Sequence, residues 1–155
     1  MSLESVRADL AARAPDLAII DQGRSTATVA EAAETLGVEP ARIAKTLAIR
    51  VGGEVVLIVT RGDARLDNQK TKAAFNARPR MLGPEETLAL TGHPVGGVCP
   101  SGLAAPLAVY LDVSLRDFDT VYPAAGSLTS SVRVSPQRLA ELVAKDWVDV
   151  CRLPD

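Results

Sequence analysis

Cysteine and histidine are scarce in this sequence of 155 residues. It contains two cysteines, Cys99 and Cys151, and one histidine, His93. Two thiols are too few for a disulfide framework or a four-thiolate zinc site, and one imidazole cannot form a paired-histidine relay. We therefore expect no bound metal, no cofactor and a reduced, cytoplasmic setting.

Aromatic residues and net positive charge are also in short supply. Aromatic residues make up 3% of the chain, and 17 Lys and Arg face 19 Asp and Glu, for a net charge of −2. Proteins that bind long stretches of nucleic acid are usually basic, and many stack bases on aromatic rings. These values argue against a general DNA-binding protein, although a local basic surface can still contact one end of a nucleic acid.

Long apolar segments are missing as well. No run approaches the roughly 18 residues that a membrane-spanning helix needs. The first nine residues include Glu4, Arg7 and Asp9, where a secretory signal would need a continuous apolar stretch. We expect a cytoplasmic protein without membrane contacts, folded as a single domain over residues 1–155. A chain of this length buries roughly 70% of the surface exposed by its unfolded form.

Helix signals recur along the chain. Apolar spacing predicts a helix over about residues 3–14. Thr28 and Glu31 form a capping box at the start of a second helix, and Gly37 is placed to end it. A short helix is predicted from Pro40 to about Ala44, and further helices are predicted after Asp67, from Pro84 and after Ser135.

Strand signals alternate irregularly with these helices. Residues 47–51 alternate apolar and polar side chains, Gly52 and Gly53 favour a hairpin turn, and residues 55–59 are apolar throughout. A strand apolar at every position is typical of a central strand covered on both faces. Shorter strands are predicted near residues 17–20, 107–111, 120–122, 131–134 and 147–150. The pattern predicts an α/β fold with a mixed sheet, curled into a barrel-like core with surrounding helices.

Lys45 is the most suggestive single residue. It follows the apolar pair Ile43 and Ala44 and precedes Thr46, at a junction between helix and strand. Its side chain can lie on the surface with the stem packed down. Alternatively, it supplies a fixed positive charge in a pocket.

A loop rich in glycine and proline, residues 92–106, is a second candidate. Backbone amides of Gly96, Gly97 and Val98 can stabilise the oxyanion formed in ester hydrolysis, or the glycines can simply form a turn. Cys99 and His93 allow a thiol–imidazole dyad. A lone cysteine between Val98 and Pro100 is more typical of a core position, so we do not expect a cysteine nucleophile.

Charge is unevenly distributed. Residues 61–80 hold six basic side chains and two acidic ones, Asp63 and Asp67. This segment is either a solvated surface or a small phosphate-binding patch. Asp112, at the end of a predicted strand, either orients a ligand or caps the following turn.

Taken in order, these segments resemble a known family. The motifs are Thr28-Val29-x-x-Ala32-Ala33-x-x-Leu36-Gly37-Val38, Ile43-Ala44-Lys45-Thr46-Leu47, Arg61-Gly62-Asp63-x-Arg65, Thr91-Gly92-His93-x-x-Gly96-Gly97-Val98-x-Pro100, Leu111-Asp112 and Ala125-Gly126-Ser127. The chain resembles the YbaK/ProX family of free-standing aminoacyl-tRNA editing domains, which includes EbsC-like members. These are related to the insertion domain of bacterial prolyl-tRNA synthetases.

The resemblance implies a barrel-like core and hydrolysis of the ester that links a wrong amino acid to a tRNA. The lysine matching Lys45 positions the substrate, and the Gly96–Pro100 loop contacts the amino acid and its carbonyl. The terminal adenosine hydroxyl of the tRNA assists, so no protein base and no metal are needed. The implied partners are the acceptor end of a mischarged aminoacyl-tRNA, with tRNA for proline carrying cysteine or alanine as the leading candidate, and prolyl-tRNA synthetase.

The predicted site has three groups of residues. The catalytic group is Lys45, Gly96 and Gly97. The substrate-binding group is Thr46, His93, Val98, Cys99, Pro100, Asp112 and Gly126. The tRNA-binding group is Arg61, Arg65, Lys70 and Lys72. A non-catalytic module that binds a tRNA acceptor end, a nucleotide or a synthetase remains the alternative.

Overall fold

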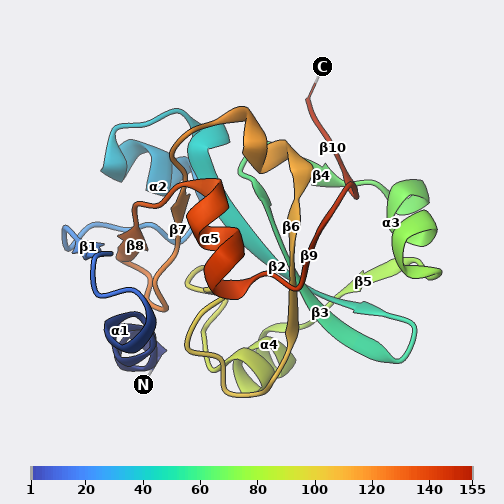
Figure 1. Cartoon of the computed structure of the whole chain (residues 1–155), viewed down its shortest axis with the longest axis horizontal. Coiled ribbons are helices and arrows are strands. Elements are labelled where there is room, and N and C mark those ends of the chain that lie inside the picture. The colour runs from blue at the N-terminus through green and yellow to red at the C-terminus, as the bar shows by residue number, and fades with distance from the viewer. Residues whose placement is uncertain (1, 155) are drawn as a thin grey trace.

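A mixed β-sheet runs through the centre of the molecule (Figure 1). The computed structural model describes residues 2–154. The strands follow the order β5-β2-β3-β6-β9, and β7 pairs with β2 beside β5. Their bounds are β2 Ile43–Val51, β3 Glu54–Arg61, β5 Pro79–Met81, β6 Ala108–Asp112, β7 Tyr122–Pro123 and β9 Asp146–Val148. The pairs β2–β3 and β2–β5 are antiparallel, whereas β2–β7, β3–β6 and β6–β9 are parallel.

Two small antiparallel pairs accompany this sheet. Strand β1 (Ile19–Asp21) pairs with β8 (Ser130–Val132), and β4 (Arg65–Leu66) pairs with β10 (Cys151–Arg152). The second pair joins the turn after β3 to the C-terminal segment, which lies at the top of Figure 1.

Helices surround the sheet and begin largely where the local signals place them. Their bounds are α1 Ser2–Arg13, α2 Val29–Leu36, α3 Asn68–Phe75, α4 Pro84–Thr91 and α5 Pro136–Val143, with 3-10 turns η1 Pro40–Arg42 and η2 Val113–Asp117. The Thr28 hydroxyl accepts from the Glu31 amide, and Gly37 ends α2 in the left-handed conformation with φ +70°. Both predicted ends of this helix are confirmed. Within residues 2–154, no helix combines the length and the apolar character that crossing a bilayer demands.

The core lies on both faces of the sheet. Leu57 and Val59 of β3 pack into the same cluster as α1, while Val56 and Ile58 pack into the cluster that Phe75 of α3 joins. Side chains alternate between the faces of a strand, so an all-apolar strand must be covered on both sides. The prediction of a central strand over residues 55–59 is confirmed.

The predicted barrel is wrong, although the mixed α/β class is confirmed. Among the described residues no sheet closes on itself, because β5 pairs only with β2 and β9 pairs only with β6. Closure requires the first and last strands to hydrogen-bond to each other. Both edge strands are three residues long. Local periodicity carries no information on whether they meet.

One edge of β2 is only partly covered. β7 pairs with Ile43 and Ala44, and β5 pairs with residues 49–51, on the side of β2 away from β3. No strand of the described chain pairs with residues 45–48 on that side. The strand also begins at Ile43, earlier than the alternation over residues 47–51 predicts, so Lys45 lies inside the strand.

Candidate active site

A cavity of about 240 Å³ opens at the uncovered edge of β2. Residues from the start of α2, the first half of β2, the end of β5, α4, the loop after α4 and the β7–β8 region surround it. The lining residues are Thr26, Ala27, Thr28, Val29, Ala32, Ile43, Ala44, Lys45, Thr46, Leu47, Ala48, Met81, Leu82, Thr87, Val95, Gly96, Val98, Tyr122, Ala124 and Ser131. The predicted residues Lys45, Thr46, Gly96 and Val98 therefore meet at one cavity.

The backbone of Thr46 faces this cavity edge. The Ala48 carbonyl accepts a hydrogen bond from the Leu82 amide, N···O 3.1 Å, which shows that the polar groups of Ala48 point away from β3. Alternate residues of a strand direct their amide and carbonyl groups to the same edge. The N–H and C=O of Thr46 thus point to the side on which β2 has no neighbouring strand, where a ligand can accept and donate hydrogen bonds.

The loop after α4 forms a tight turn at the cavity mouth. The Gly97 amide donates to the Pro94 carbonyl, N···O 2.9 Å, and Gly96 has φ +93°. A positive φ at the third position is the mark of a type II turn and favours glycine. Within residues 2–154 the amides of Gly96 and Val98 donate to no other group. These two amides can therefore bind a carbonyl oxygen.

Gly97 does not fit the oxyanion role predicted for it. Its amide is used within the turn. A side chain at this position would also lie 2.9 Å from the Ser127 carbonyl oxygen, so the glycine lets two backbone segments approach. Gly97 therefore serves loop packing, and Gly96 and Val98 remain the candidate amide donors.

Two buried hydroxyl groups beside the cavity have no partner. The Oγ1 atoms of Thr26 and Thr46 make no hydrogen bond within the described chain. Most buried polar groups are paired, since an unpaired one costs free energy. Rotation about χ1 exchanges the hydroxyl and methyl positions of threonine, so either oxygen can turn toward a ligand in the cavity.

Lys45 combines burial with a fixed contact. Its ammonium donates to the Ala64 carbonyl, in the turn after β3. Burial lowers the pKa of Lys45 below its ordinary value, while the nearby Asp63 carboxylate opposes that shift. Lys45 therefore lines the cavity and holds a partly buried, positioned cation against the turn after β3.

His93 and Cys99 lie in the protein interior and do not line the cavity. His93 is 0% exposed, its Nε2 lies 2.8 Å from the Ser101 carbonyl oxygen, and burial lowers its pKa. Burial raises the pKa of Cys99 to about 12. The thiol is therefore protonated at neutral pH and unsuited to nucleophilic attack.

Pro100, Asp112 and Gly126 are also not among the residues that line the cavity. The two Asp112 oxygens accept from the amides of Ser114 and Val150, at 3.0 and 2.9 Å, so this carboxylate caps η2 and ties down the C-terminal segment. Gly126, with φ +92°, packs against the start of α1. The structure thus shows a capping role for Asp112 and a packing role for Gly126, and it does not bring Pro100 to the cavity lining.

The predicted tRNA-binding residues divide into two pairs. Arg61 forms ion pairs with Asp63 and Asp117, both at 2.7 Å, and Lys70 pairs with Asp149 at 3.1 Å. Arg65 and Lys72 are exposed and form no ion pair with a described carboxylate. Of these four residues, Arg65 and Lys72 can therefore contact phosphate without breaking an ion pair within the described chain.

Several cavity residues escape prediction from the sequence. Thr26, Thr87, Tyr122 and Ser131 come from four separate segments, and none belongs to a recognisable motif. Tyr122 carries the one usable signal, because it is one of five aromatic residues in the chain and lies at the end of a predicted strand. The other three are small polar residues of a kind common throughout the chain.

Comparison with known proteins shows which family this chain is similar to. The family profile described as aminoacyl-tRNA editing domain matches residues 24–142. The uncharacterized protein YwhH of Bacillus subtilis is 48% identical over 154 residues, which cover 98% of each chain. "Putative Cys-tRNA(Pro)/Cys-tRNA(Cys) deacylase EbsC" of Enterococcus faecalis is 30% identical over 76% of this chain and 73% of its own length.

Synthetases and a solved structure extend the comparison. A proline–tRNA ligase of Acidithiobacillus ferrooxidans is 38% identical over 60% of this chain, which is 17% of the ligase. A crystal structure described as "a putative trans-editing enzyme for prolyl tRNA synthetase" superposes with a TM-score of 0.89 at 32% identity, covering 97% of both chains. The chain therefore belongs to the aminoacyl-tRNA editing domain family.

Proposed function

We propose that this protein is a deacylase that hydrolyses the ester between a small, wrongly attached amino acid and a tRNA. The observation that carries the proposal is the cavity at the edge of β2. There the unpaired amides of Gly96 and Val98, the backbone of Thr46 and the cation of Lys45 line one space. Membership of the editing family supports ester hydrolysis as the chemistry.

The size of the cavity favours a small amino acid. Pockets for drug-sized ligands usually measure about 300–1,000 Å³, and this one measures about 240 Å³. Gly96 packs closely against Ala27: a Cβ atom added at Gly96 would lie 3.0 Å from the Ala27 carbonyl oxygen. Because the two backbone segments are in close contact, the cavity cannot easily widen on this side. We expect cysteinyl, alanyl, seryl or 2-aminobutyryl esters to fit, and prolyl and larger esters to be excluded by steric overlap.

The chemistry we propose uses the substrate's own groups. Water attacks the ester carbonyl, and the amides of Gly96 and Val98 stabilise the negative charge that develops on its oxygen. Lys45 holds a ribose or phosphate oxygen by a charge-assisted hydrogen bond. A hydroxyl of the terminal adenosine assists the attacking water. The bond between the carbonyl carbon and the ribose oxygen then breaks, the amino acid leaves as the free acid with the oxygen of the water, and the ribose oxygen takes up the proton that the water gives up.

The relatives support tRNA for proline as the substrate carrier. The ligase matched above acts on proline and tRNA by its name, and the deacylase relative is named for tRNA(Pro) and tRNA(Cys). We propose that the editing reaction follows release of the mischarged tRNA, with prolyl-tRNA synthetase as a candidate partner.

Deacylation rates across a panel of mischarged tRNAs test this proposal. We expect rapid release of cysteine, alanine, serine or 2-aminobutyrate from tRNA for proline, and stable prolyl-tRNA. Lys145→Met, which removes the charge of an exposed lysine outside the cavity and outside the predicted tRNA-binding group, serves as a charge-matched control for Lys45→Met. Tight tRNA binding without release of any amino acid would overturn the hydrolase assignment and favour the non-catalytic binding module.

A further inference from the structure

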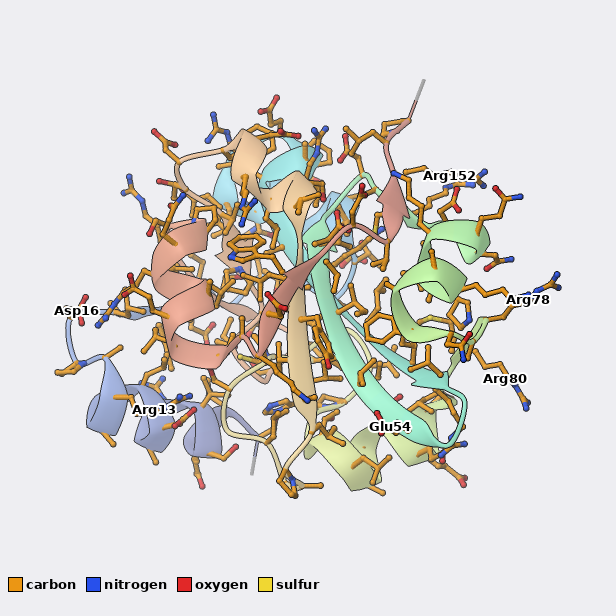
Figure 2. All side chains as sticks on the ribbon, turned by 45° about the vertical axis from the view of Figure 1, so that its right-hand side comes forward. Arg13, Asp16, Glu54, Arg78, Arg80 and Arg152 are labelled. Carbon is orange, nitrogen blue, oxygen red and sulfur yellow. The ribbon has the colours of Figure 1, made fainter. Side chains whose placement is uncertain are left out.

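Two arginines lie directly opposite each other at the C-terminal strand pair. Arg152 of β10 is in register with Arg65 of β4, and Cys151 is in register with Leu66. Cys151 and Leu66 contribute to the core, so the alternation of side chains places both arginines on the outer face. Figure 2 shows Arg152 extending outward on the side of the molecule where α3 lies.

This arrangement concentrates positive charge. Like charges directly opposite each other on an antiparallel pair repel. Neither Arg65 nor Arg152 forms an ion pair with a carboxylate of residues 2–154, in contrast to Arg61 and Lys70 nearby. A bound anion would offset the repulsion that the fold leaves in place.

A groove of about 400 Å³ lies between these side chains. Asp63, Arg65, Arg152, Leu153 and Pro154 line it. Among the described lining residues the one carboxylate is that of Asp63, which is held by the Arg61 guanidinium through two contacts, Nε–Oδ1 at 2.9 Å and Nη2–Oδ2 at 2.7 Å. Since Arg61 offsets the charge of Asp63, the described lining of the groove carries a net positive charge from Arg65 and Arg152.

The groove adjoins the candidate active site. Lys45 lines the cavity at the edge of β2, and its ammonium reaches the carbonyl of Ala64, the residue between Asp63 and Arg65. The cavity and the groove are therefore separated by about the length of one lysine side chain. A polymer whose reactive end occupies the cavity can place a backbone group in the groove.

We propose that Arg65 and Arg152 clamp a backbone phosphate of the single-stranded 3′ end of tRNA, next to the nucleotide that carries the amino acid. The proposal rests on the proposed function, which puts that 3′ end in the cavity. Guanidinium groups bind phosphate oxygens through paired N–H donors in a fixed geometry. Two opposed arginines at one groove match this chemistry, whereas Arg61 and Lys70 are already engaged in intramolecular ion pairs.

Binding of uncharged tRNA to Arg65→Gln/Arg152→Gln tests the clamp without requiring catalysis. We expect the affinity, measured by fluorescence anisotropy, to fall about tenfold or more. The dependence of log K on log salt should become shallower by about 0.7 for the loss of one phosphate contact on a single strand. The melting temperature should stay the same or rise, because the repulsion between the arginines is removed.

Arg7→Gln/Arg133→Gln is the matched control. Both positions are exposed, both lie outside the groove, and the change in net charge is the same. Equal affinity losses in the two double variants would show a general charge effect and overturn the clamp. A tRNA lacking its 3′ CCA end should bind the parent and Arg65→Gln/Arg152→Gln equally, and a persisting difference would overturn the placement at the 3′ end.

Two further readouts separate the clamp from neighbouring hypotheses. If no mischarged tRNA is hydrolysed but the loss of affinity depends on the CCA end, the proposed function fails while the clamp holds. If hydrolysis occurs and Arg65→Gln/Arg152→Gln leaves KM unchanged, the clamp fails while the function holds. Inorganic phosphate at millimolar concentration should compete only weakly with tRNA, and strong competition would instead indicate a site for free phosphate.

Discussion

Replacing Thr46 by valine should raise stability and lower activity at the same time. The Thr46 hydroxyl is buried and unpaired, and an unsatisfied buried polar group costs about 1–3 kcal/mol. Valine keeps the shape and removes the polar atom. Because Thr46 is only half-buried, we take the lower end and expect about 1 kcal/mol of added stability, or about 2–4 °C in melting temperature for a domain of this size.

The effect on catalysis should have the opposite sign. If the hydroxyl turns to bind the aminoacyl group, its loss removes one neutral hydrogen bond worth about 0.5–1.5 kcal/mol. That energy corresponds to a decrease of about two- to tenfold in kcat/KM for deacylation. Urea titration gives the free energy of unfolding, and initial rates with mischarged tRNA give the activity.

Thr60→Val is the matched control for stability. Thr60 lies in the neighbouring strand β3, is 0% exposed, and its hydroxyl lies 3.1 Å from the Ser114 hydroxyl. The same substitution there breaks a formed hydrogen bond and should cost about 0.5–1.5 kcal/mol, so the intrinsic strand preference of valine cancels in the comparison. A Thr46→Val variant that loses stability as Thr60→Val does, or that keeps full activity, would refute the reasoning.

Lys45→Met should keep its melting temperature and lose at least tenfold in deacylation rate. Burial lowers the pKa of Lys45, whose ordinary value is 10.5, so the unfolded chain binds more protons here and this residue's contribution to stability rises with pH up to about that value. Parental activity should accordingly decline on the alkaline side below pH 10.5, after subtraction of spontaneous hydrolysis, and the variant should show no such limb. Cys99→Ser should retain substantial activity and form no acyl-enzyme adduct, because the pKa of about 12 keeps the thiol protonated; a trapped thioester together with complete inactivation would support a cysteine hydrolase. Gly96→Ala should lose about 1–3 kcal/mol, because φ is +93° and the new Cβ would lie 3.0 Å from the Ala27 oxygen. Gly53→Ala, with no atom within 4 Å of its Cβ position, should unfold at nearly the parental urea concentration, and equal losses in both variants would contradict the steric argument.

The helix ends and the central hairpin follow from the sequence because their signals are local. The Thr28 cap acts on an amide three residues away, and the Gly52-Gly53 turn joins β2 to β3, with Val51 paired to Glu54. The uniform apolar run over residues 55–59 similarly predicts burial on both faces. Such contacts span a few residues, so the order of side chains is enough to predict them.

The site was predicted only in part. Lys45, Thr46, Gly96 and Val98 lie in motif segments, and the structure brings all four to one cavity. His93 is in the same loop as Gly96, yet its side chain turns inward to Ser101. Proximity along the chain does not fix which way a loop residue points.

Long-range pairing decided the rest. The cavity exists because β5 and β7, which are 41 residues apart between Met81 and Tyr122, pair with the two ends of β2 and leave its middle uncovered. The Arg61 guanidinium is engaged in an ion pair with Asp117, a residue distant in sequence, and is therefore not available to bind a phosphate without breaking that contact. Local periodicity determines whether a segment can form a strand or carry a charge. The register of distant strands, set by packing of the whole core, determines which edge stays open and which charge stays free.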